Sequence, residues 1–277
     1  MIYVKAILGL GLMGAIFGLA LALAAKKFAV EQDPRQEMIV EVLPGANCGG
    51  CGFPGCSGLA AAIVAGKAPV DACPVGGSTV AAKVAAIMGV EAGAAKERKV
   101  ARVLCQGGTG QCGVRFVYDG FADCKAAQLV GGGAKACAYG CLGMGSCVAA
   151  CSFDALHMGP DGLPVVDEEA CTSCGRCVAA CPRGIIQLVP ESQSVTVLCR
   201  SYARGADVRK TCKVGCIGCG LCMKACPNGA ITMDNNLAVI DPAKCDACGK
   251  CVEKCPTKSI VMRSRNTTAG TGSLAAS

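Results

Sequence analysis

The chain has few large aromatic side chains and a single histidine. It contains no Trp, 4 Tyr and 6 Phe among 277 residues, so aromatic residues make up 4% of the sequence. A core made from so few large side chains is poor, so the fold needs a further source of stability. His157 is the only histidine, and no Ser/His/Asp arrangement or pair of carboxylates stands out. The sequence therefore gives no basis for acid–base chemistry.

Cysteine is abundant instead, with 25 residues, of which 20 fall into five groups of four. The three clearest groups have the spacing Cys-x2-Cys-x2-Cys-x3-Cys-Pro and begin at Cys171, Cys216 and Cys245. Thiolates at this spacing hold a [4Fe-4S] cluster, and the fourth cysteine of each run ligates the neighbouring cluster. A chain with so many clusters is suited to moving single electrons from site to site.

Two other uses of many cysteines fit the sequence less well. The odd count and the tight triplets disfavour a secreted disulfide scaffold. Structural zinc prefers two separated Cys-x2-Cys pairs. Reduced thiols and clusters indicate the cytoplasm.

The side chains alone give a formal net charge of +7. An oxidised [4Fe-4S] core with four thiolates carries about −2, so five clusters would add about −10. The basic residues then compensate for the clusters, and nothing in their arrangement indicates nucleic-acid binding.

A long apolar run opens the sequence. Residues 6–25 are uncharged, and Lys5 and Lys26-Lys27 flank them. Twenty residues at 1.5 Å each span about 30 Å, the thickness of a bilayer core, so we expect a transmembrane helix. The lysines after the run indicate a cytoplasmic C-terminal bulk. Gly14-x3-Gly18 is either a packing face for another membrane helix or part of a simple anchor.

Two rival interpretations of this run are weaker. Residues 22–24 resemble a signal-peptide cleavage site, but the run is long for a signal peptide and export would expose clusters to oxidation. Gly9-x-Gly11-x2-Gly14 matches the dinucleotide fingerprint. The helix is apolar on every face, however, and cysteine motifs follow too soon for a βαβ unit.

The first cysteine group, in residues 48–73, has the spacing Cys-x2-Cys-x4-Cys-x16-Cys. Its glycines permit a tight backbone and offer N–H groups to cluster sulfurs. We expect one [4Fe-4S] cluster here, with a short helix over residues 57–65. Ser78 or Thr79 could cap a following helix that runs through Met88.

The remainder of the chain repeats itself. An offset of 75 places Cys199, Cys212, Cys216, Cys222 and Cys226 on Cys124, Cys137, Cys141, Cys147 and Cys151, and an offset of 74 aligns the last group with the one that begins at Cys171. Such self-similarity indicates duplication. Each half has the layout of a bacterial two-cluster ferredoxin, with turns at residues 160–162 and 234–236.

The expected fold class is therefore α+β, with a single N-terminal transmembrane helix, a small [4Fe-4S] domain and two duplicated bacterial two-cluster ferredoxin-like units. The expected boundaries are anchor 1–27, connector 28–44, single-cluster domain 45–79, helix and linker 80–123, first ferredoxin-like unit 124–190, second unit 191–263, and disordered tail 264–277.

Crossover of the fourth cysteine assigns five ligand sets. They are Cys48, Cys51, Cys56 and Cys73; Cys137, Cys141, Cys147 and Cys181; Cys151, Cys171, Cys174 and Cys177; Cys216, Cys219, Cys222 and Cys255; and Cys226, Cys245, Cys248 and Cys251. The second set departs from the pattern, because Met144 stands where the duplicate has Cys219. We expect Cys137 to supply the missing thiolate, and the alternative is a three-cysteine site with a labile iron.

Five cysteines stay outside these sets: Cys105, Cys112, Cys124, Cys199 and Cys212. They are either small buried residues beside the clusters or a sixth metal site. The duplicate keeps Cys212 although it also has Cys219, which weakens the case that Cys137 is simply a replacement.

Two basic runs stand out, at residues 96–102 and 204–213. Such runs are usually solvated faces. The functional interpretation is docking of an acidic redox partner, because electrostatic steering raises the encounter rate.

The order of these parts resembles one family closely, the B subunits of the Rnf complex, an ion-translocating ferredoxin:NAD+ oxidoreductase. The signatures are NCGGCGFPGC with Cys73-Pro74, KACAYGCLGMGSC and KTCKVGCIGCGLCMKACP. The resemblance covers nearly all of residues 1–263. The first motif alone is less specific, since corrinoid iron–sulfur proteins carry a similar one.

The resemblance implies a component of a bacterial inner-membrane complex that takes electrons from reduced ferredoxin. Other subunits would carry the flavins, the NAD(H) site and the Na+ or H+ path. We expect ferredoxin to meet the C-terminal units and electrons to run toward the Cys48–Cys73 cluster. The alternatives are a polyferredoxin component of another membrane enzyme, such as a hydrogenase, and a non-redox zinc or structural module.

Overall fold

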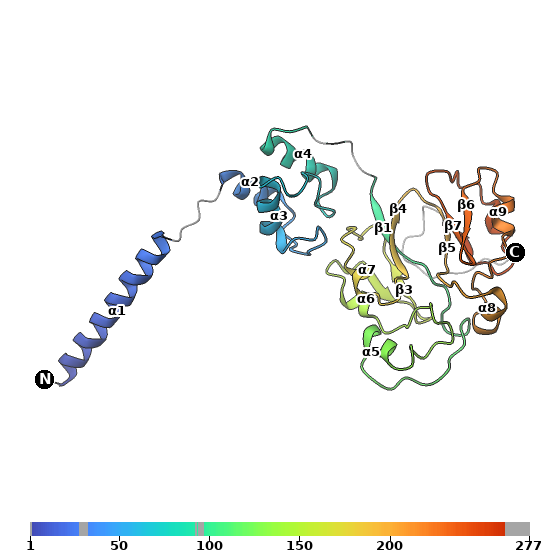
Figure 1. Cartoon of the computed structure of the whole chain (residues 1–277), viewed down its shortest axis with the longest axis horizontal. Coiled ribbons are helices and arrows are strands. Elements are labelled where there is room, and N and C mark those ends of the chain that lie inside the picture. The colour runs from blue at the N-terminus through green and yellow to red at the C-terminus, as the bar shows by residue number, and fades with distance from the viewer. Residues whose placement is uncertain (1, 28–32, 92, 94–96, 264–277) are drawn as a thin grey trace.

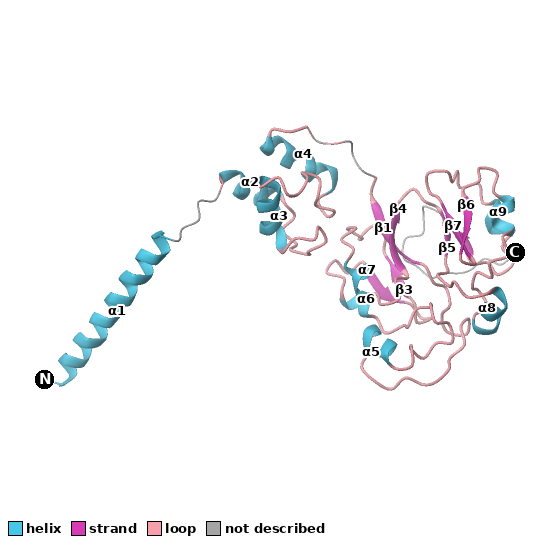
Figure 2. Cartoon of the chain, in the orientation of Figure 1, coloured by secondary structure: helices cyan, strands magenta, loops and turns pink. Residues whose placement is uncertain are grey.

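The computed structural model describes residues 2–27, 33–91, 93 and 97–263 (Figures 1 and 2). The helices are α1 (Ile2–Lys27), α2 (Pro34–Val42), α3 (Gly55–Val64), α4 (Gly77–Met88), α5 (Cys124–Leu129), α6 (Ser146–Ala149), α7 (Arg176–Ala180), α8 (Gly205–Thr211), α9 (Leu221–Ala225) and α10 (Lys250–Glu253). The strands are β1 (Lys99–Val103), β2 (Leu156–Met158), β3 (Pro164–Val166), β4 (Ile186–Pro190), β5 (Val195–Val197), β6 (Ile231–Asp234), β7 (Leu237–Ile240) and β8 (Ile260–Met262). The tail expected to be disordered, residues 264–277, lies outside the described residues.

Helix α1 fits the expected anchor in length and composition. Its segment Ile7–Lys27 has a mean hydropathy of 2.3, and none of it is buried against the described parts of the chain. An added Cβ at Gly11, Gly14 or Gly18 would meet no atom within 4 Å. A segment of 21 residues with this hydropathy is long enough to cross a bilayer core.

Helices α2, α3 and α4 pack around one small core of Ile39, Leu59, Ile63 and Val84. Asp33 caps α2 by accepting a hydrogen bond from the Arg35 amide at 2.9 Å, and α3 confirms the short helix expected after Cys56. Helix α4 ends at Met88 as expected, with Gly89 in the left-handed conformation. The expected cap was wrong: α4 begins earlier, and its N-cap residue Gly76 makes no side-chain hydrogen bond.

The two ferredoxin-like units have the same topology. In the first, β1 pairs antiparallel with β4 and β2 with β3; in the second, β5 pairs with β8 and β6 with β7. The turns expected at residues 160–162 and 234–236 join the hairpins, and Gly162, Asn235 and Asn236 have positive φ there. Strand β1 lies within the stretch expected as helix and linker, and it completes the first unit by pairing with β4 (Figure 2).

Strand register corrects one part of the duplication. Val103 pairs with Ile186 as Val197 pairs with Ile260. Cys105 and Cys199 each follow the paired strand by two residues, so Cys199 is the structural counterpart of Cys105 and not of Cys124. A constant offset misses this because the first unit carries an insertion: 32 positions separate Cys105 from Cys137, against 13 from Cys199 to Cys212.

A buried arginine joins the two units. Arg102 on β1 is 3% exposed, and its guanidinium donates to Glu168 Oε1 at 3.1 Å and to Thr196 Oγ1 on β5 at 3.1 Å. The first basic run is therefore structural at this position. The second run, residues 204–213, presents exposed Arg204, Arg209, Lys210 and Lys213, as a solvated face does.

Candidate iron–sulfur sites

Cysteines surround four cavities in the ferredoxin-like units. Site 1B is lined by Cys151, Cys171, Cys174 and Cys177, and site 2A by Cys216, Cys219, Cys222 and Cys255. In both, the structure brings together all four cysteines assigned from the sequence, including the distant fourth residue that the crossover supplies.

Site 1A differs from its expected composition. Its cavity is lined by Cys124, Cys141, Cys147 and Cys181. Cys137 lines a different cavity, and Met144 lines neither of the two. Cys124 lies at the start of α5 in the insertion of the first unit. The sequence does show extra cysteines, Cys112 and Cys124, between Cys105 and Cys137. Aligning the two units by a constant offset hid the fact that these residues belong to an insertion.

Hydrogen bonds fix Cys124 at site 1A. The Cys124 amide donates to Ser146 Oγ at 2.7 Å, and that hydroxyl donates to Asp123 Oδ2 at 2.8 Å. Asp123 also caps α5 by accepting from the Ala126 amide at 2.9 Å. Ser146 begins α6, the helix that carries Cys147, so the network ties the insertion to the helix of another lining cysteine.

The other two expected sites use their own local supports. In site N (Cys48, Cys51, Cys56 and Cys73), the Asn47 side chain accepts a hydrogen bond from the Cys56 amide at 2.8 Å. Gly55 has a φ of 77°, and a Cβ there would lie 2.8 Å from Asn47 Oδ1, so this turn requires glycine. Site 2B consists of Cys226, Cys245, Cys248 and Cys251. Burial raises the pKa of the Cys251 thiol, and the other three cysteines are close enough to raise it further.

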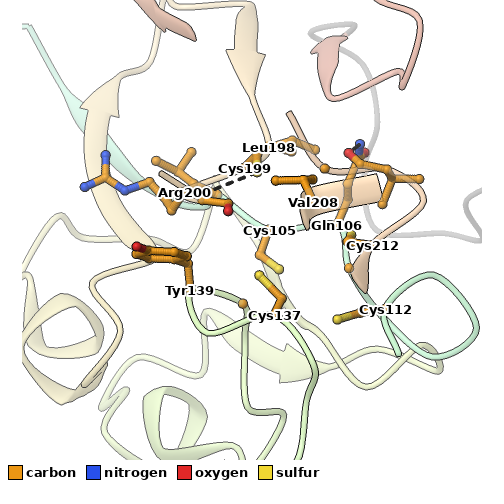
Figure 3. Close-up of a pocket in the computed structure, with 16 residues that line it drawn as sticks. Cys105, Gln106, Cys112, Cys137, Tyr139, Leu198, Cys199, Arg200, Val208 and Cys212 are labelled. Atoms are coloured by element: carbon orange, nitrogen blue, oxygen red, sulfur yellow. Dashed lines mark hydrogen bonds between the residues drawn. The ribbon is translucent and has the colours of Figure 1, made fainter. Parts of the chain in front are cut away.

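Of the five cysteines that the sequence left outside the ligand sets, four line the same cavity as Cys137. The central cavity is lined by Cys105, Cys112, Cys137, Cys199 and Cys212 (Figure 3). By strand register and offset, Cys105 corresponds to Cys199, and Cys137 corresponds to Cys212. The cavity is therefore built from two equivalent pairs, one from each unit, together with Cys112 from the insertion.

Backbone N–H groups point at several of these sulfurs. Ala101 N lies 3.4 Å from Cys171 Sγ, Ala230 N lies 3.3 Å from Cys226 Sγ, and Gly76 N lies 3.4 Å from Cys73 Sγ. Donors of this kind stabilise thiolates that ligate a metal centre and tune its reduction potential.

Burial raises the pKa of several cysteines. It raises the pKa of Cys141 and Cys177 to about 12, and of Cys147 and Cys222 to about 11. In the central cavity, a hydrogen-bonding contact with Cys212 lowers the pKa of Cys112 to about 6 and raises that of Cys212. A buried thiol with a raised pKa ligates only if a cationic centre compensates for the loss of its proton.

The arrangement fits a polynuclear cluster better than a single ion. Among the described residues, no three His, Cys, Asp or Glu side chains are close enough to hold one metal ion. The cysteines stand around cavities instead. Thr172 lines the cavity of site 1B, and its buried Oγ1 has no hydrogen-bond partner among the described residues. A sulfur of a cluster bound there would be the acceptor this hydroxyl lacks.

Fold and sites together define an iron–sulfur protein with one N-terminal helix that is long and apolar enough to span a membrane. Family models agree with the sites: a putative Fe-S cluster model matches residues 43–75, a 4Fe-4S binding domain matches residues 164–187, and a 4Fe-4S dicluster domain matches residues 215–259.

Curated relatives narrow the class to one family. The chain is 55% identical over 236 residues to the B subunit of the Na(+)-translocating ferredoxin:NAD(+) oxidoreductase complex of Acetobacterium woodii, covering 85% of this chain and 71% of the relative. It is 48% identical to the proton-translocating counterpart from Clostridium ljungdahlii, over 84% of this chain and 82% of the relative. It is 47% identical to the B subunit of the ion-translocating oxidoreductase complex of Methanosarcina acetivorans, over 84% of this chain and 88% of the relative. The chain belongs to this family of B subunits.

Proposed function

We propose that this chain is the electron-relay component of a membrane-bound, ion-translocating ferredoxin:NAD+ oxidoreductase, and that it accepts electrons from reduced ferredoxin. The observation that carries the proposal is the set of cysteine-lined cavities in a chain of this family. A bound [4Fe-4S] cluster supplies reversible one-electron transfer. The chain's residues hold the clusters, exclude water from them and set their potentials.

Sites N, 1B, 2A and 2B keep the ligand sets given by the sequence. For site 1A we propose Cys124, Cys141, Cys147 and Cys181, because these four line one cavity and Cys137 does not. The central cavity is proposed as a sixth metal centre. Its support is the convergence of five cysteines, among them two symmetry-related pairs from the two units.

Helix α1 is proposed to anchor the chain in the cytoplasmic membrane as a single span. Lys26 and Lys27 follow the apolar segment, and a basic flank of this kind stays on the cytoplasmic side. Every cysteine follows α1 in sequence, so all the sites would lie in the cytoplasm, where thiols remain reduced.

Electrons are proposed to enter at the C-terminal unit and leave through site N, which is nearest to α1 in sequence. Replacing Cys48 with Ser tests this order in the assembled complex. Electron transfer from ferredoxin should still reduce the other sites, whereas turnover of the complex should stop. Wild-type turnover in that variant would contradict the order.

Iron and acid-labile sulfide per chain, measured on protein purified without oxygen, test the cluster proposal as a whole. About 24 iron atoms would support five clusters and the sixth centre, and about 20 would support five clusters alone. Little iron together with bound zinc would overturn the electron-relay function.

A further inference from the structure

The loop of site N meets the loop of site 1B at one glycine. Gly50 lies between Cys48 and Cys51, and a Cβ built on it would overlap the carbonyl oxygen of Cys174. The same Cβ would lie 3.0 Å from the Cα atom of Cys174 and 3.1 Å from its carbonyl carbon. All three are backbone atoms, so no side-chain rotation could make room.

Backbone conformation does not explain this glycine. The φ angle of Gly50 lies outside the left-handed range, unlike those of Gly49 (70°) and Gly52 (84°) in the same loop. The φ angle of Gly50 therefore does not itself require glycine. What excludes a side chain here is the close approach of a cysteine-bearing loop from another domain.

The linker between α4 and β1 also joins the domain of site N to the loop of site 1B. Strand β1, which follows the linker from α4, is hydrogen-bonded to the loop that carries Cys171 and Cys174. Arg98 Nη2 donates to the Cys171 carbonyl at 2.9 Å, and Ser173 Oγ donates to the Lys99 carbonyl. The linker is therefore fixed at its C-terminal end beside site 1B.

Linker length makes docking of the two domains an intramolecular event. Residues 89–98 separate α4 from β1, and ten residues reach at most about 35 Å. A tether of this length holds its two ends at an effective concentration in the millimolar range. A small contact can then stay occupied although it would be too weak between separate proteins.

We infer that Gly50 is the docking point of the N-terminal domain on the Cys174 loop, and that sites N and 1B are consecutive carriers in the relay. The inference rests on the proposed function and adds the identity of the neighbour of site N. At this step one site loses one electron and the other gains it, and no bond is made or broken. A Cβ at position 50 separates the two loops and lengthens the path between the sites.

The test compares Gly50→Ala with the matched control Gly93→Ala in the full, cluster-loaded chain. Gly93 also has an ordinary φ, and a Cβ there would meet nothing within 4 Å. We expect Gly50→Ala to keep its iron, to lose the magnetic coupling between the two reduced sites in EPR spectra, and to exchange the amide hydrogens of residues 172–175 faster. Turnover of the assembled complex should fall about tenfold, and the control should match the wild type.

A second variant covers the case in which Gly50→Ala disturbs cluster assembly. Inserting twenty Gly and Ser residues after Gly93 leaves both loops intact and triples the linker. Effective concentration falls with about the −3/2 power of length, so it should drop about fivefold, and the magnetic coupling should weaken accordingly. Wild-type coupling and amide protection in both variants would overturn the docking inference. A wild-type chain without iron would overturn the proposed function instead, whatever the amide exchange shows.

Discussion

At the scale of single residues, metal ligation requires the buried thiols of this chain to lose their protons. Buried Cys141 and Cys177 have pKa values raised to about 12, so at neutral pH the bare sites hold neutral thiols. Binding of iron displaces those protons, and the free energy of binding adds to the free energy of folding. This compensates for a sequence without Trp and with little aromatic surface to bury.

The identity of the fourth ligand at site 1A is testable with pairs of substitutions. Cys124→Ser combined with Cys141→Ser should lose no more iron than either change alone, about four atoms per chain, because both residues serve one site. Cys137→Ser combined with Cys141→Ser should lose about twice as much, since these residues serve two sites. Iron analysis of the purified single and double variants decides, and the reverse pattern would restore Cys137 to site 1A.

Thr172 should raise the reduction potential of site 1B. Its buried hydroxyl lines that cavity without a protein partner among the described residues, and a donor beside a cluster sulfur favours the more negative, reduced state. Thr172→Val removes the donor at nearly constant volume. A bond worth about 1 kcal/mol corresponds to roughly 40 mV for one electron, so the potential should fall by about that amount.

EPR-monitored redox titration measures this shift. The matched control is Ile217→Val in site 2A, which changes volume without removing a donor. An unchanged potential in Thr172→Val would mean that the hydroxyl does not act on the cluster.

At the scale of elements, β1 carries Arg102 into the junction of the two ferredoxin-like units. Its guanidinium contacts Glu168 in the first unit, and the Gln193 carbonyl and Thr196 at the start of the second. Burial lowers the pKa of Arg102, yet the side chain stays charged, since its ordinary value is far above neutral pH.

Arg102→Ala should destabilise the cluster-loaded protein by about 3 kcal/mol. The change leaves buried acceptors without a donor, although Arg263 still pairs with Glu168. Urea unfolding under anaerobic conditions measures the loss, and the exposed Lys99→Ala on the same strand is the control. Equal midpoints for the two variants would show that Arg102 does not hold the junction.

Much of this arrangement follows from the sequence, and the exceptions have a common cause. The apolar run of residues 6–25 predicted the N-terminal helix, and turn residues predicted the hairpin turns. The spacing of the cysteine motifs predicted that Cys151 and Cys255 would join distant cysteines, and the structure places both in cavities with those partners. The cavity beside Cys124 could not be found that way. An insertion breaks the offset between the two units, and only the pairing of β1 with β4 shows which cysteines correspond.

The cap of α4 shows the same limit on a smaller scale. Ser78 and Thr79 are good capping residues, yet the helix begins at Gly77 with Gly76 as its N-cap residue. A Cβ at Gly76 would lie 2.6 Å from Val80 Cβ in the first turn of the same helix, so this position favours glycine. The preference of Ser and Thr for capping positions did not reveal this local packing.

At the scale of the whole molecule, helix α1 stands apart from the cysteine-bearing part of the chain. Nothing in the described structure packs on Ile7–Lys27. Deleting residues 2–27 should therefore move the protein from the membrane pellet to the soluble fraction with its iron content unchanged. Fractionation followed by iron analysis measures both. Mass spectrometry of the full-length chain gives the companion check, because a cleaved N-terminus would mean that the helix is a signal peptide.

The crossed ligand sets also determine the order in which the sites can be completed during translation. Site 2A lacks its last thiol until the ribosome has added Cys255, 33 residues after Cys222. At about 5–20 residues per second this takes about 2 to 7 s. Reading the last cysteine of each set along the chain gives the order N, 1B, 1A, central, 2B, 2A. The nascent polypeptide thus completes these ligand sets from its N-terminal end toward its C-terminal end, and the proposed electron entry point is finished last.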